Sequence, residues 1–440
     1  MNTEELAKNV ISALSSNGVT EWRYKAAEHT TLKFKAKNRE ITPLLSDKAE
    51  SLVIDMVKGG KKASAAVSSF DAQVMKSAVK KALESDSEAS VREFPQVVPA
   101  KVELWDSEIK ALIEDPARAK QLIQTAVDTI ETEAKYKGVE LETAEAYLTL
   151  KYSESIFQSS KNAEPLPGAR TSVSLAVGIN DEQLEYEESG KMLSPDAFSR
   201  VPTECLARVL KDKKSPEDIG IDRKNAVIIL APDAVAELLE GIASNHFSLL
   251  TKQQGLSKLE RGMTLSELPI TLHDNPLEDY MTGSYRCDDE GIPGRKKTLI
   301  ENGVFKMFVN DLDTAQKANQ EPTGNAARTG NSIRPVPSNL IMEPGQTPLE
   351  EMLSSVDKGI LAIRSMGTHS ADDVTGNFNF NVNEGLVIEN GKYTAQPSPG
   401  SWVFKTNGID FMKQIIEVSR ERKNLGTALL PWIKIRAELG

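Results

Sequence analysis

The hydrophobicity of residues 20–69 repeats at every second position, and this alternation restricts the possible folds more than any other feature of the sequence. At 32–36 apolar residues alternate with lysines, and apolar residues return at every second position of 52–56. Because neighbouring side chains of a strand point to opposite faces, these runs predict antiparallel strands with one buried face. The pair Gly59-Gly60 separates two such runs and indicates a hairpin.

The rest of the first half combines helical periodicity with alternating strands. We predict helices at 3–16, 70–84, 116–136 and 195–212, a linker at 92–105 and further strands within 139–190. The charged stretch 211–224, which contains Pro216 and Gly220, marks the main boundary. We therefore expect an N-terminal domain at 1–90, a central domain at 91–218 and a β-rich C-terminal domain at 219–440.

The second half begins with a buried-type strand at 226–230, followed by a helix that starts at Pro232. Two Asn-Gly pairs between alternating runs, at 302–303 and 390–391, predict hairpins. We also expect helices at 348–358 and 408–421 and a last strand at 432–435. The predicted fold class is α+β, with two halves that each have a curved, mostly antiparallel sheet and packed helices.

Composition narrows the range of partners and compartments. Lys and Arg number 53 and Asp and Glu number 64, so the net charge is −11. An acidic surface repels phosphate backbones, which argues against direct nucleic-acid binding. Cys205 and Cys287 lie far apart, which fits the reducing cytoplasm better than a disulfide framework. The first residues lack the charge pattern of a signal peptide, and no apolar run reaches the length of a membrane helix, so we expect a cytoplasmic protein without membrane contact.

The motifs of metal and nucleophile catalysis are missing. The sequence has neither H-E-x-x-H nor G-x-S-x-G, so we predict no catalytic residue and no metal ligand. His246, His273 and Cys287 could converge on a metal in space, but their spacing does not require it. We consider scattered structural residues the commoner explanation. Acidic residues follow Cys287, and their charge should raise the thiol pKa and make it unreactive.

Two loops share the sequence Thr-Gly-Asn. They are Thr323, Gly324 and Asn325, and then Thr375, Gly376 and Asn377. Such loops permit positive φ and a close approach of the backbone, so one interpretation is a pair of loops that line a cavity or chamber. The other interpretation is ordinary turn chemistry, which composition alone favours.

Five segments of the second half occur in the order and spacing of a known family. They are Asp-Glu-Gly-Ile-Pro at 289–293 and the segments 299–315, 323–330, 339–353 and 375–391. In this ordered set the chain resembles the TldD/PmbA family, also called the modulator of DNA gyrase family, and within it the PmbA/TldE-like branch. The N-terminal half is similar more loosely, through its hairpin at 57–61 and the flanking helix.

This resemblance implies a two-subunit, zinc-dependent cytoplasmic protease that cleaves unfolded or leader peptides. In the TldD branch, H-E-x-x-x-H on the helix that opens the C-terminal half binds zinc with a later cysteine, and its glutamate acts as general base. The PmbA branch lacks this motif and pairs with a TldD-like subunit to enclose the chamber. Peptide is bound there in extended form, which is consistent with strand addition to a sheet edge.

The helix expected at 232–247 does not carry the zinc motif. If His246 is placed at its second histidine, Gly241 takes the position of the first histidine and Ile242 that of the glutamate. Neither residue can bind a metal or accept a proton. The resemblance therefore implies a non-catalytic subunit without a cofactor of its own, with zinc on the TldD-like partner of a heterodimer. A homodimer could form when that partner is missing. Residues 398–408 depart from the pattern of the branch, which leaves any role of that stretch open.

Two other functions are compatible with the sequence. The first is a stand-alone metal-dependent hydrolase with an unrecognised site around His246, His273 and Cys287. The second is a gyrase-related regulatory binding protein, which the old family name suggests. The net charge of −11 argues against direct contact of such a protein with DNA, although an acidic protein can bind a basic partner.

Overall fold

The structure of the chain is a computed structural model with two halves, each built on a sheet. It describes residues 1–440 except for positions 1, 39, 85–86, 89–92, 181–183, 195, 209–211, 331, 367–376 and 408–409. The side chains of 87–88, 184–189, 240–245, 366 and 377–378 are also outside the description.

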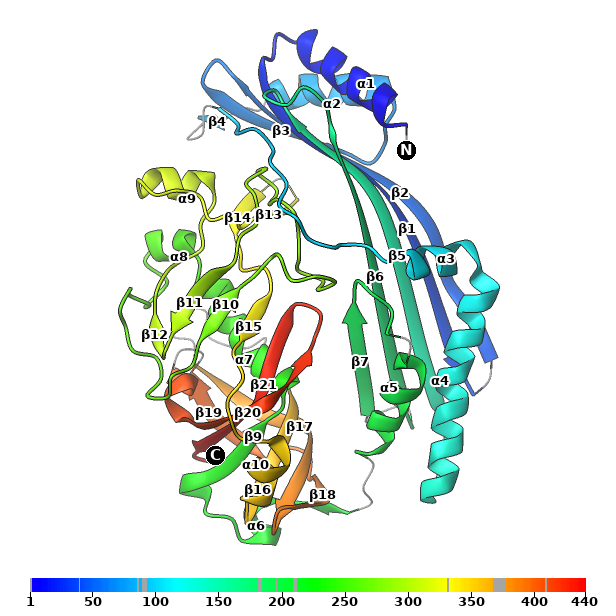
Figure 1. Ribbon diagram of the computed structural model, residues 1–440, viewed down its shortest axis with the longest axis vertical. Coiled ribbons are helices and arrows are strands. Elements are labelled where there is room, and N and C mark those ends of the chain that lie inside the picture. The colour runs from blue at the N-terminus through cyan, green and yellow to red at the C-terminus, as the bar shows by residue number, and fades with distance from the viewer. Residues whose placement is uncertain are drawn as a thin grey trace.

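The N-terminal half contains a seven-stranded sheet with the order β4-β3-β2-β1-β5-β6-β7, in which all neighbours are antiparallel (Figure 1). Its strands are β1 Glu21–Lys37, β2 Glu40–Lys58, β3 Lys61–Val67, β4 Ser87–Glu88, β5 Ala144–Ser159, β6 Leu166–Ile179 and β7 Leu184–Gly190. Strand β1 pairs with β5 from Arg23 to Lys37. The ranges 1–90 and 91–218 therefore share one sheet, and the boundary expected at residue 90 does not separate two sheets.

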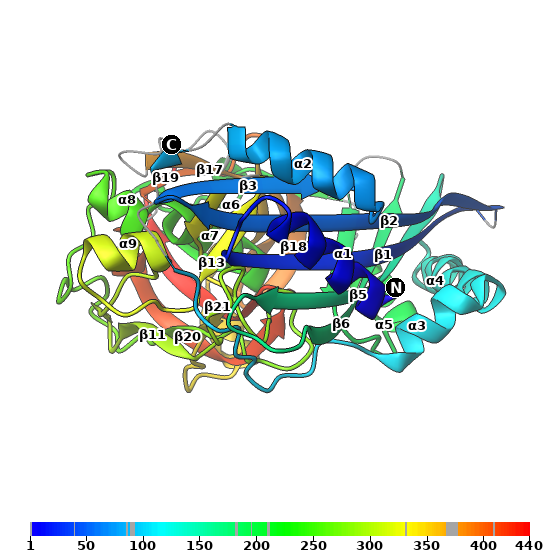
Figure 2. The ribbon, with the colours of Figure 1, turned by 90° about the horizontal axis from the view of Figure 1, so that it is seen from above.

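Helices cover one face of this sheet at both of its ends (Figures 1 and 2). They are α1 Thr3–Ser15 and α2 Ala72–Glu84 at one end, and α3 Ser107–Glu114, α4 Pro116–Lys137 and α5 Ala197–Leu206 at the other. Even-numbered residues of β1, such as Tyr24 and Phe34, are buried in the cores under these helices. Odd-numbered residues, including Lys25 and Lys33, lie on the opposite face. The alternation at 20–69 is thus confirmed as antiparallel strands.

The ends of α4 follow directly from its sequence. Asp115 caps the N-terminus by accepting a hydrogen bond from the Arg118 N–H, and Pro116 occupies the first turn. Gly138 ends the helix at φ 63°, a left-handed conformation that glycine adopts without a steric cost. The predicted helix at 116–136 is confirmed.

The C-terminal half contains a twelve-stranded sheet with the order β12-β11-β10-β15-β21-β9-β16-β17-β18-β8, to which β19 and β20 add at β17 and β21. The pairs β15–β21, β9–β16 and β8–β18 are parallel, and the other pairs are antiparallel. Its strands are β8 Lys213–Lys214, β9 Ala226–Leu230, β10 Leu272–Asp274, β11 Lys297–Glu301, β12 Val304–Phe305, β15 Leu340–Met342, β16 Lys358–Met366, β17 Asn377–Glu389, β18 Lys392–Pro397, β19 Val403–Asn407, β20 Ile415–Asn424 and β21 Ala428–Ala437. A separate hairpin is formed by β13 Ala326–Thr329 and β14 Ser332–Pro335.

Short helices complete this half. They are α6 Pro216–Ile219, α7 Pro232–Asn245, α8 Leu249–Gln253, α9 Leu312–Lys317 and α10 Leu349–Ser354, with 3-10 turns η1 Arg223–Asn225 and η3 Asp410–Gln414. Both Asn-Gly hairpins are confirmed, since Asn302 and Gly303 have φ 48° and 79° and Asn390 and Gly391 have φ 51° and 71°. These positive values fit the turn that connects two twisted strands in two residues.

The helix predicted at 408–421 is wrong. The structure has a short 3-10 turn and then β20, which pairs with β21 along most of its length. The charged residues at 420–423 have good helix propensity, but pairing with the core strand β21 outweighs this local preference. The strand predicted at 432–435 lies within β21.

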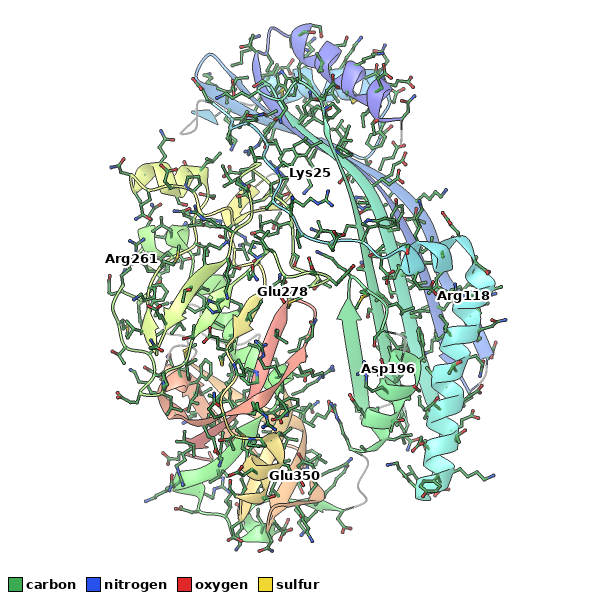
Figure 3. The ribbon with its side chains drawn as sticks, in the orientation of Figure 1. Lys25, Arg118, Asp196, Arg261, Glu278 and Glu350 are labelled. Atoms are coloured by element: carbon green, nitrogen blue, oxygen red, sulfur yellow. The ribbon has the colours of Figure 1, made fainter. Side chains whose placement is uncertain are left out.

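The two halves meet along segment 93–106, which follows the face of the C-terminal half. The N–H groups of Val98 and Ala100 donate to the carbonyl oxygens of Gly291 and Arg286. Lys25 Nζ lies 2.7 Å from Asp289 Oδ1, and Figure 3 shows Lys25 in the upper part of the view, between the two halves. No helix in the described ranges is long and apolar enough to cross a membrane.

Candidate functional site

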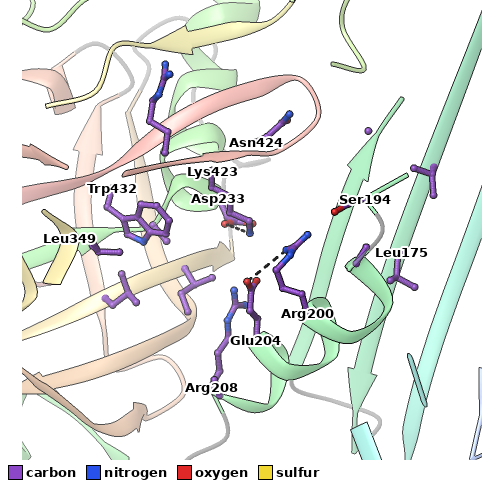
Figure 4. Close-up of a pocket in the computed structure, with 18 of the residues that line it drawn as sticks. Leu175, Ser194, Arg200, Glu204, Arg208, Asp233, Leu349, Lys423, Asn424 and Trp432 are labelled. Atoms are coloured by element: carbon purple, nitrogen blue, oxygen red, sulfur yellow. Dashed lines mark hydrogen bonds and ion pairs between the residues drawn. The ribbon is translucent and has the colours of Figure 1, made fainter. Parts of the chain in front are cut away.

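A cleft of about 730 Å³ lies between the two halves (Figure 4). One wall comes from β6, from α5 and from the loop that follows β7. The other wall comes from β16, β17 and β21, from the start of α7 and from the hairpin of β20 and β21. The cleft therefore exists only because segments from both halves of the chain come together.

Apolar side chains of the C-terminal sheet form the floor of the cleft. Leu361, Ile363, Leu386 and Trp432 line it, and they belong to a small core cluster on one face of the sheet. The alternate residues of β16, such as Ile360, point into the main core on the other face. Because β16 is covered on both faces, its sequence is almost continuously hydrophobic.

Ion pairs surround this floor. On α5, Arg200 lies 3.7 Å from Glu204, and across the cleft Lys423 Nζ lies 3.0 Å from Asp233 (Figure 4). Burial lowers the pKa of Lys423, and the Asp233 carboxylate partly opposes that shift. Both carboxylates are thus already paired with cations.

A third pair joins the halves at the bottom of the cleft, where Arg208 at the end of α5 contacts Glu384 in β17. Burial raises the pKa of Glu384, while Arg208 and then Arg364 oppose the increase. Neither histidine nor cysteine is among the cleft residues that the structure describes. The described lining of the cleft thus combines an apolar floor with paired charged groups.

The structure places His246, His273 and Cys287 in separate environments. His273 contacts Thr298 and Glu343, with 3.0 Å between its Nε2 and the glutamate. Cys287 is on the loop that contacts the N-terminal half, and its pKa is raised to about 12, chiefly by burial, with smaller effects from its acidic neighbours. Acidic neighbours were expected to raise this pKa, and burial is the larger cause.

His246 follows α7 and is 1% exposed. Its Nδ1 has no hydrogen-bond partner among the described residues, and burial, together with Lys258, lowers its pKa. Within the described residues there is no group of three or more His, Cys, Asp or Glu that could hold a metal ion. Gly241 and Ile242 lie within α7, as the predicted helix required, although their side-chain surroundings are outside the description.

The first Thr-Gly-Asn loop is buried. Thr323 exchanges hydrogen bonds with Asn310, and Asn325 accepts one from Lys297 at 2.7 Å and donates one to Asp274 at 2.7 Å. Gly324 has φ +74°, and a Cβ there would lie 2.6 Å from the Pro293 carbonyl oxygen. These contacts connect strands within the C-terminal half, and none of the three residues lines the cleft. They favour the interpretation as structural turn chemistry.

The second loop is largely outside the description. Thr375 and Gly376 are not among the described residues, and Asn377 is the first residue of β17, where it pairs with Asn407. Its side chain is not described.

Sequence reasoning missed the cleft residues. The only local signal is the spacing of Arg200 and Glu204, four residues apart on one helix. Asp233 and Lys423 are 190 residues apart, and Arg208 and Glu384 are 176 apart. Only the tertiary packing of α5, α7 and the C-terminal strands, which short sequence windows do not show, brings these residues together.

Residues 223–438 match the family described as "PmbA/TldA metallopeptidase C-terminal domain". A "Metalloprotease TldD homolog" of Buchnera aphidicola is 34% identical over 160 residues, which are 36% of this chain and 32% of that protein. A "Zinc metalloprotease TldD homolog" of Saccharolobus solfataricus is 31% identical over 261 residues, covering 55% of this chain and 57% of that protein. The chain thus spans between about a third and just over half of the length of these relatives.

Two solved structures are similar over almost the whole chain. A protein of Thermotoga maritima described as a modulator of a DNA gyrase has a TM-score of 0.84 at 18% identity, covering 99% of this chain and 100% of that one. TldE from Thermococcus kodakarensis has a TM-score of 0.79 at 20% identity, covering 99% of both chains. The α+β fold class and the family resemblance predicted from the sequence are confirmed.

Proposed function

We propose that the chain, whose residues 223–438 match the family described as "PmbA/TldA metallopeptidase C-terminal domain", is a PmbA/TldE-like, non-catalytic subunit of a zinc metalloprotease complex. Its partner is a TldD-like subunit that carries the zinc, and the complex cleaves unfolded or leader peptides in the cytoplasm. Without that partner the chain can form a homodimer. No cofactor is assigned to this chain.

The observation that carries this proposal is the composition of α7. This helix opens the C-terminal half, where the TldD branch has H-E-x-x-x-H. With His246 at the second histidine position, Gly241 and Ile242 occupy the positions of the first histidine and the glutamate. Glycine offers no side-chain ligand and isoleucine no lone pair, so a catalytic zinc with its general base does not fit here. We therefore derive no zinc-dependent step for this chain.

The cleft supports a role in peptide binding. Its apolar floor around Leu386 and Trp432 fits alternate side chains of an extended peptide, and its ion pairs can contact polar ones. Strand β7 is at the edge of the seven-stranded sheet, and the cleft lining includes Gly190 at its end. An edge strand offers unpaired backbone groups to an added peptide strand.

The test is an unfolded-peptide cleavage assay with metal analysis. It uses this chain alone, a TldD-like protein of the same organism alone, and the two mixed. We expect cleavage in the mixture, zinc in the partner only, and loss of cleavage when the partner is first stripped of metal by a chelator. Cleavage and stoichiometric zinc in this chain alone would contradict the proposal.

A stand-alone metal-dependent hydrolase is the second candidate. The buried imidazole of His246, whose Nδ1 has no hydrogen-bond partner among the described residues, is the observation that favours it. Zinc that co-purifies with this chain and is lost in His246→Gln would support that function. Capture of gyrase by this chain in a salt-sensitive pull-down, without a TldD-like protein, would instead support a regulatory binding protein.

A further inference from the structure

A second cavity, of about 430 Å³, lies along β1, β5 and β6 of the N-terminal sheet. Four of its lining residues are basic, namely Lys33, Lys151, Arg170 and Lys191, and most of the others carry hydroxyl groups. No described carboxylate lines it. Such a concentration of positive charge is unexpected in a chain whose net charge is −11.

Strand register brings the cations on the sheet together. Lys33 of β1 pairs with Thr149 of β5, and Lys151 of β5 pairs with Ser172 of β6. Side chains of paired residues lie on the same face of a sheet, so Lys33 and Lys151 both lie on the face opposite the helices. Their ammonium groups form no ion pair with a carboxylate that the structure describes.

Lys191 and Arg170 add two basic side chains where the N-terminal half contacts Ser284 of the C-terminal half. Lys191 is 1% exposed, and its Nζ donates to the Ser284 carbonyl oxygen at 2.5 Å. Arg170 donates to the same oxygen at 2.8 Å. Burial, and then the charge of Arg170, lower the pKa of Lys191 to about 6. One carbonyl oxygen thus accepts hydrogen bonds from both basic side chains, and burial favours the uncharged form of the Lys191 amine.

The carboxylate that acts on Arg170 already has other partners. Asp289 attracts Arg170, but it lies 2.7 Å from Lys25 Nζ and accepts a hydrogen bond from the Arg328 N–H. A buried cation without an anionic partner is energetically costly. Of these two side chains only Lys191 is buried, because Arg170 is exposed. An anion in the cavity would favour the charged form of Lys191, would attract Arg170 and would accept hydrogen bonds from the hydroxyl groups around it.

We propose that the cavity bounded by Lys33, Lys151, Arg170 and Lys191 is a binding site for an oxyanion, either a carboxylate or a phosphate group. A carboxylate and a phosphate group offer this site the same features, namely negative charge and several oxygen atoms that accept hydrogen bonds. They can come from the acidic side chains of a peptide or from free phosphate. The cavity shares no polar lining residue with the cleft. The proposal does not depend on the proposed function of the chain.

Isothermal titration calorimetry on the full chain tests this site directly. The probes are inorganic phosphate and a tetraglutamate peptide, each titrated into wild type, Lys151→Gln and Lys191→Met. The matched control is Lys48→Gln, which removes the same charge from an exposed position of β2 outside the cavity. We expect one site per chain, weakened about tenfold by either cavity substitution because each removes a charge-assisted hydrogen bond, and unchanged in the control.

The two probes distinguish the sources of the anion. Binding of tetraglutamate with the same dependence on Lys151 assigns the site to acidic peptide, and binding of phosphate alone assigns it to a free small anion. The proposal is wrong if neither probe binds wild type, or if Lys151→Gln and Lys48→Gln weaken binding equally. Lys151 is exposed, so its variant remains informative even if Lys191→Met fails to fold. Because no cleavage is measured, failure of this proposal leaves the protease-subunit proposal unaffected.

Discussion

Nε of Arg23 lies 2.8 Å from Oδ2 of Asp55, and the two side chains are only 2% and 3% exposed. The same guanidinium donates to the carbonyl oxygen and the carboxylate of Glu290, in the other half of the chain. The guanidinium carbon Cζ of Arg23 lies 4.6 Å from the centre of the Phe94 ring. Burial alone would raise the pKa of Asp55, but Arg23 and Arg328 more than offset it, so the pKa is lowered. One buried arginine thus connects the N-terminal sheet to the C-terminal half.

Replacing this arginine is expected to destabilise the whole chain. Arg23→Ala leaves Glu290 buried without its cation and Asp55 with Arg328 alone, and breaking a buried pair in this way costs roughly 3–5 kcal/mol. Chemical denaturation should show a much lower midpoint. Lys8→Ala removes one partner of the exposed Lys8–Glu4 pair and should leave the midpoint nearly unchanged. Equal effects of the two substitutions would show that burial of the Arg23 pair does not matter.

The Thr-Gly-Asn loop offers a test of its structural role. Gly324→Ala places a Cβ 2.6 Å from the Pro293 carbonyl oxygen in a backbone with φ +74°, so both contact and conformation oppose it. Gly330→Ala has φ +58° but no atom within 4 Å of the new Cβ, so only conformation opposes it. We expect Gly330→Ala to cost about 1 kcal/mol and Gly324→Ala clearly more, measured as free energies of unfolding. Similar costs would contradict a tight contact at Gly324.

The sequence predicted local structure well and long-range geometry poorly. Alternation in β1 and the Asn-Gly turns depend on neighbouring residues, so these elements could be recognised from short windows. The predicted helix at 408–421 failed because β20 owes its conformation to β21 rather than to its own composition. The boundary expected at residue 90 falls within one sheet for the same reason, since the pairing of β1 with β5 crosses it.

Neither cavity had a signal in the sequence. Lys33 and Lys151 are ordinary exposed-face lysines of two alternating strands, and only the strand register shows that they share a site. The charges of the cleft come from α5, from Asp233 at the start of α7 and from β20 near the C-terminus. What the sequence did show was the family resemblance and the missing zinc motif, because both depend on residue order alone.

The buried Lys191 makes stability depend on pH with a definite sign. Its pKa is about 6 in the folded chain against 10.5 for an ordinary lysine, so between these values the unfolded chain binds more protons. Stability attributable to this group therefore rises with pH above about 6, with a slope of at most about 1.4 kcal/mol per pH unit. Below pH 6 the slope from this group vanishes.

Urea denaturation of wild type and Lys191→Met between pH 6 and pH 9 measures this contribution. We expect the stability of wild type to rise with pH relative to that of Lys191→Met. The stability of the control Lys48→Met should change with pH as that of wild type does. Phosphate at saturating concentration should reduce the slope, because a bound anion favours the charged lysine. A pH-independent difference would show that Lys191 is fully protonated in the folded chain.

Filling the cleft is expected to reduce peptide cleavage by the mixture without reducing stability. Ala207 is exposed at the end of α5 and lines the cleft, so Ala207→Trp adds a large ring where we expect peptide to bind. The expected result is an increase of about tenfold in KM, equivalent to about 1.4 kcal/mol of binding free energy, with the melting temperature unchanged. Ala207→Ser is the control, because it changes polarity but adds only one heavy atom, and the KM of this variant should remain that of wild type.

If the mixture that contains Ala207→Trp cleaves peptide as wild type does, and the variant still associates with the TldD-like partner, peptide does not pass through this cleft. The proposed contribution of the cleft to substrate binding would then have to be abandoned, whereas the assignment of the chain as the non-catalytic subunit, which depends on the residues of α7, would remain.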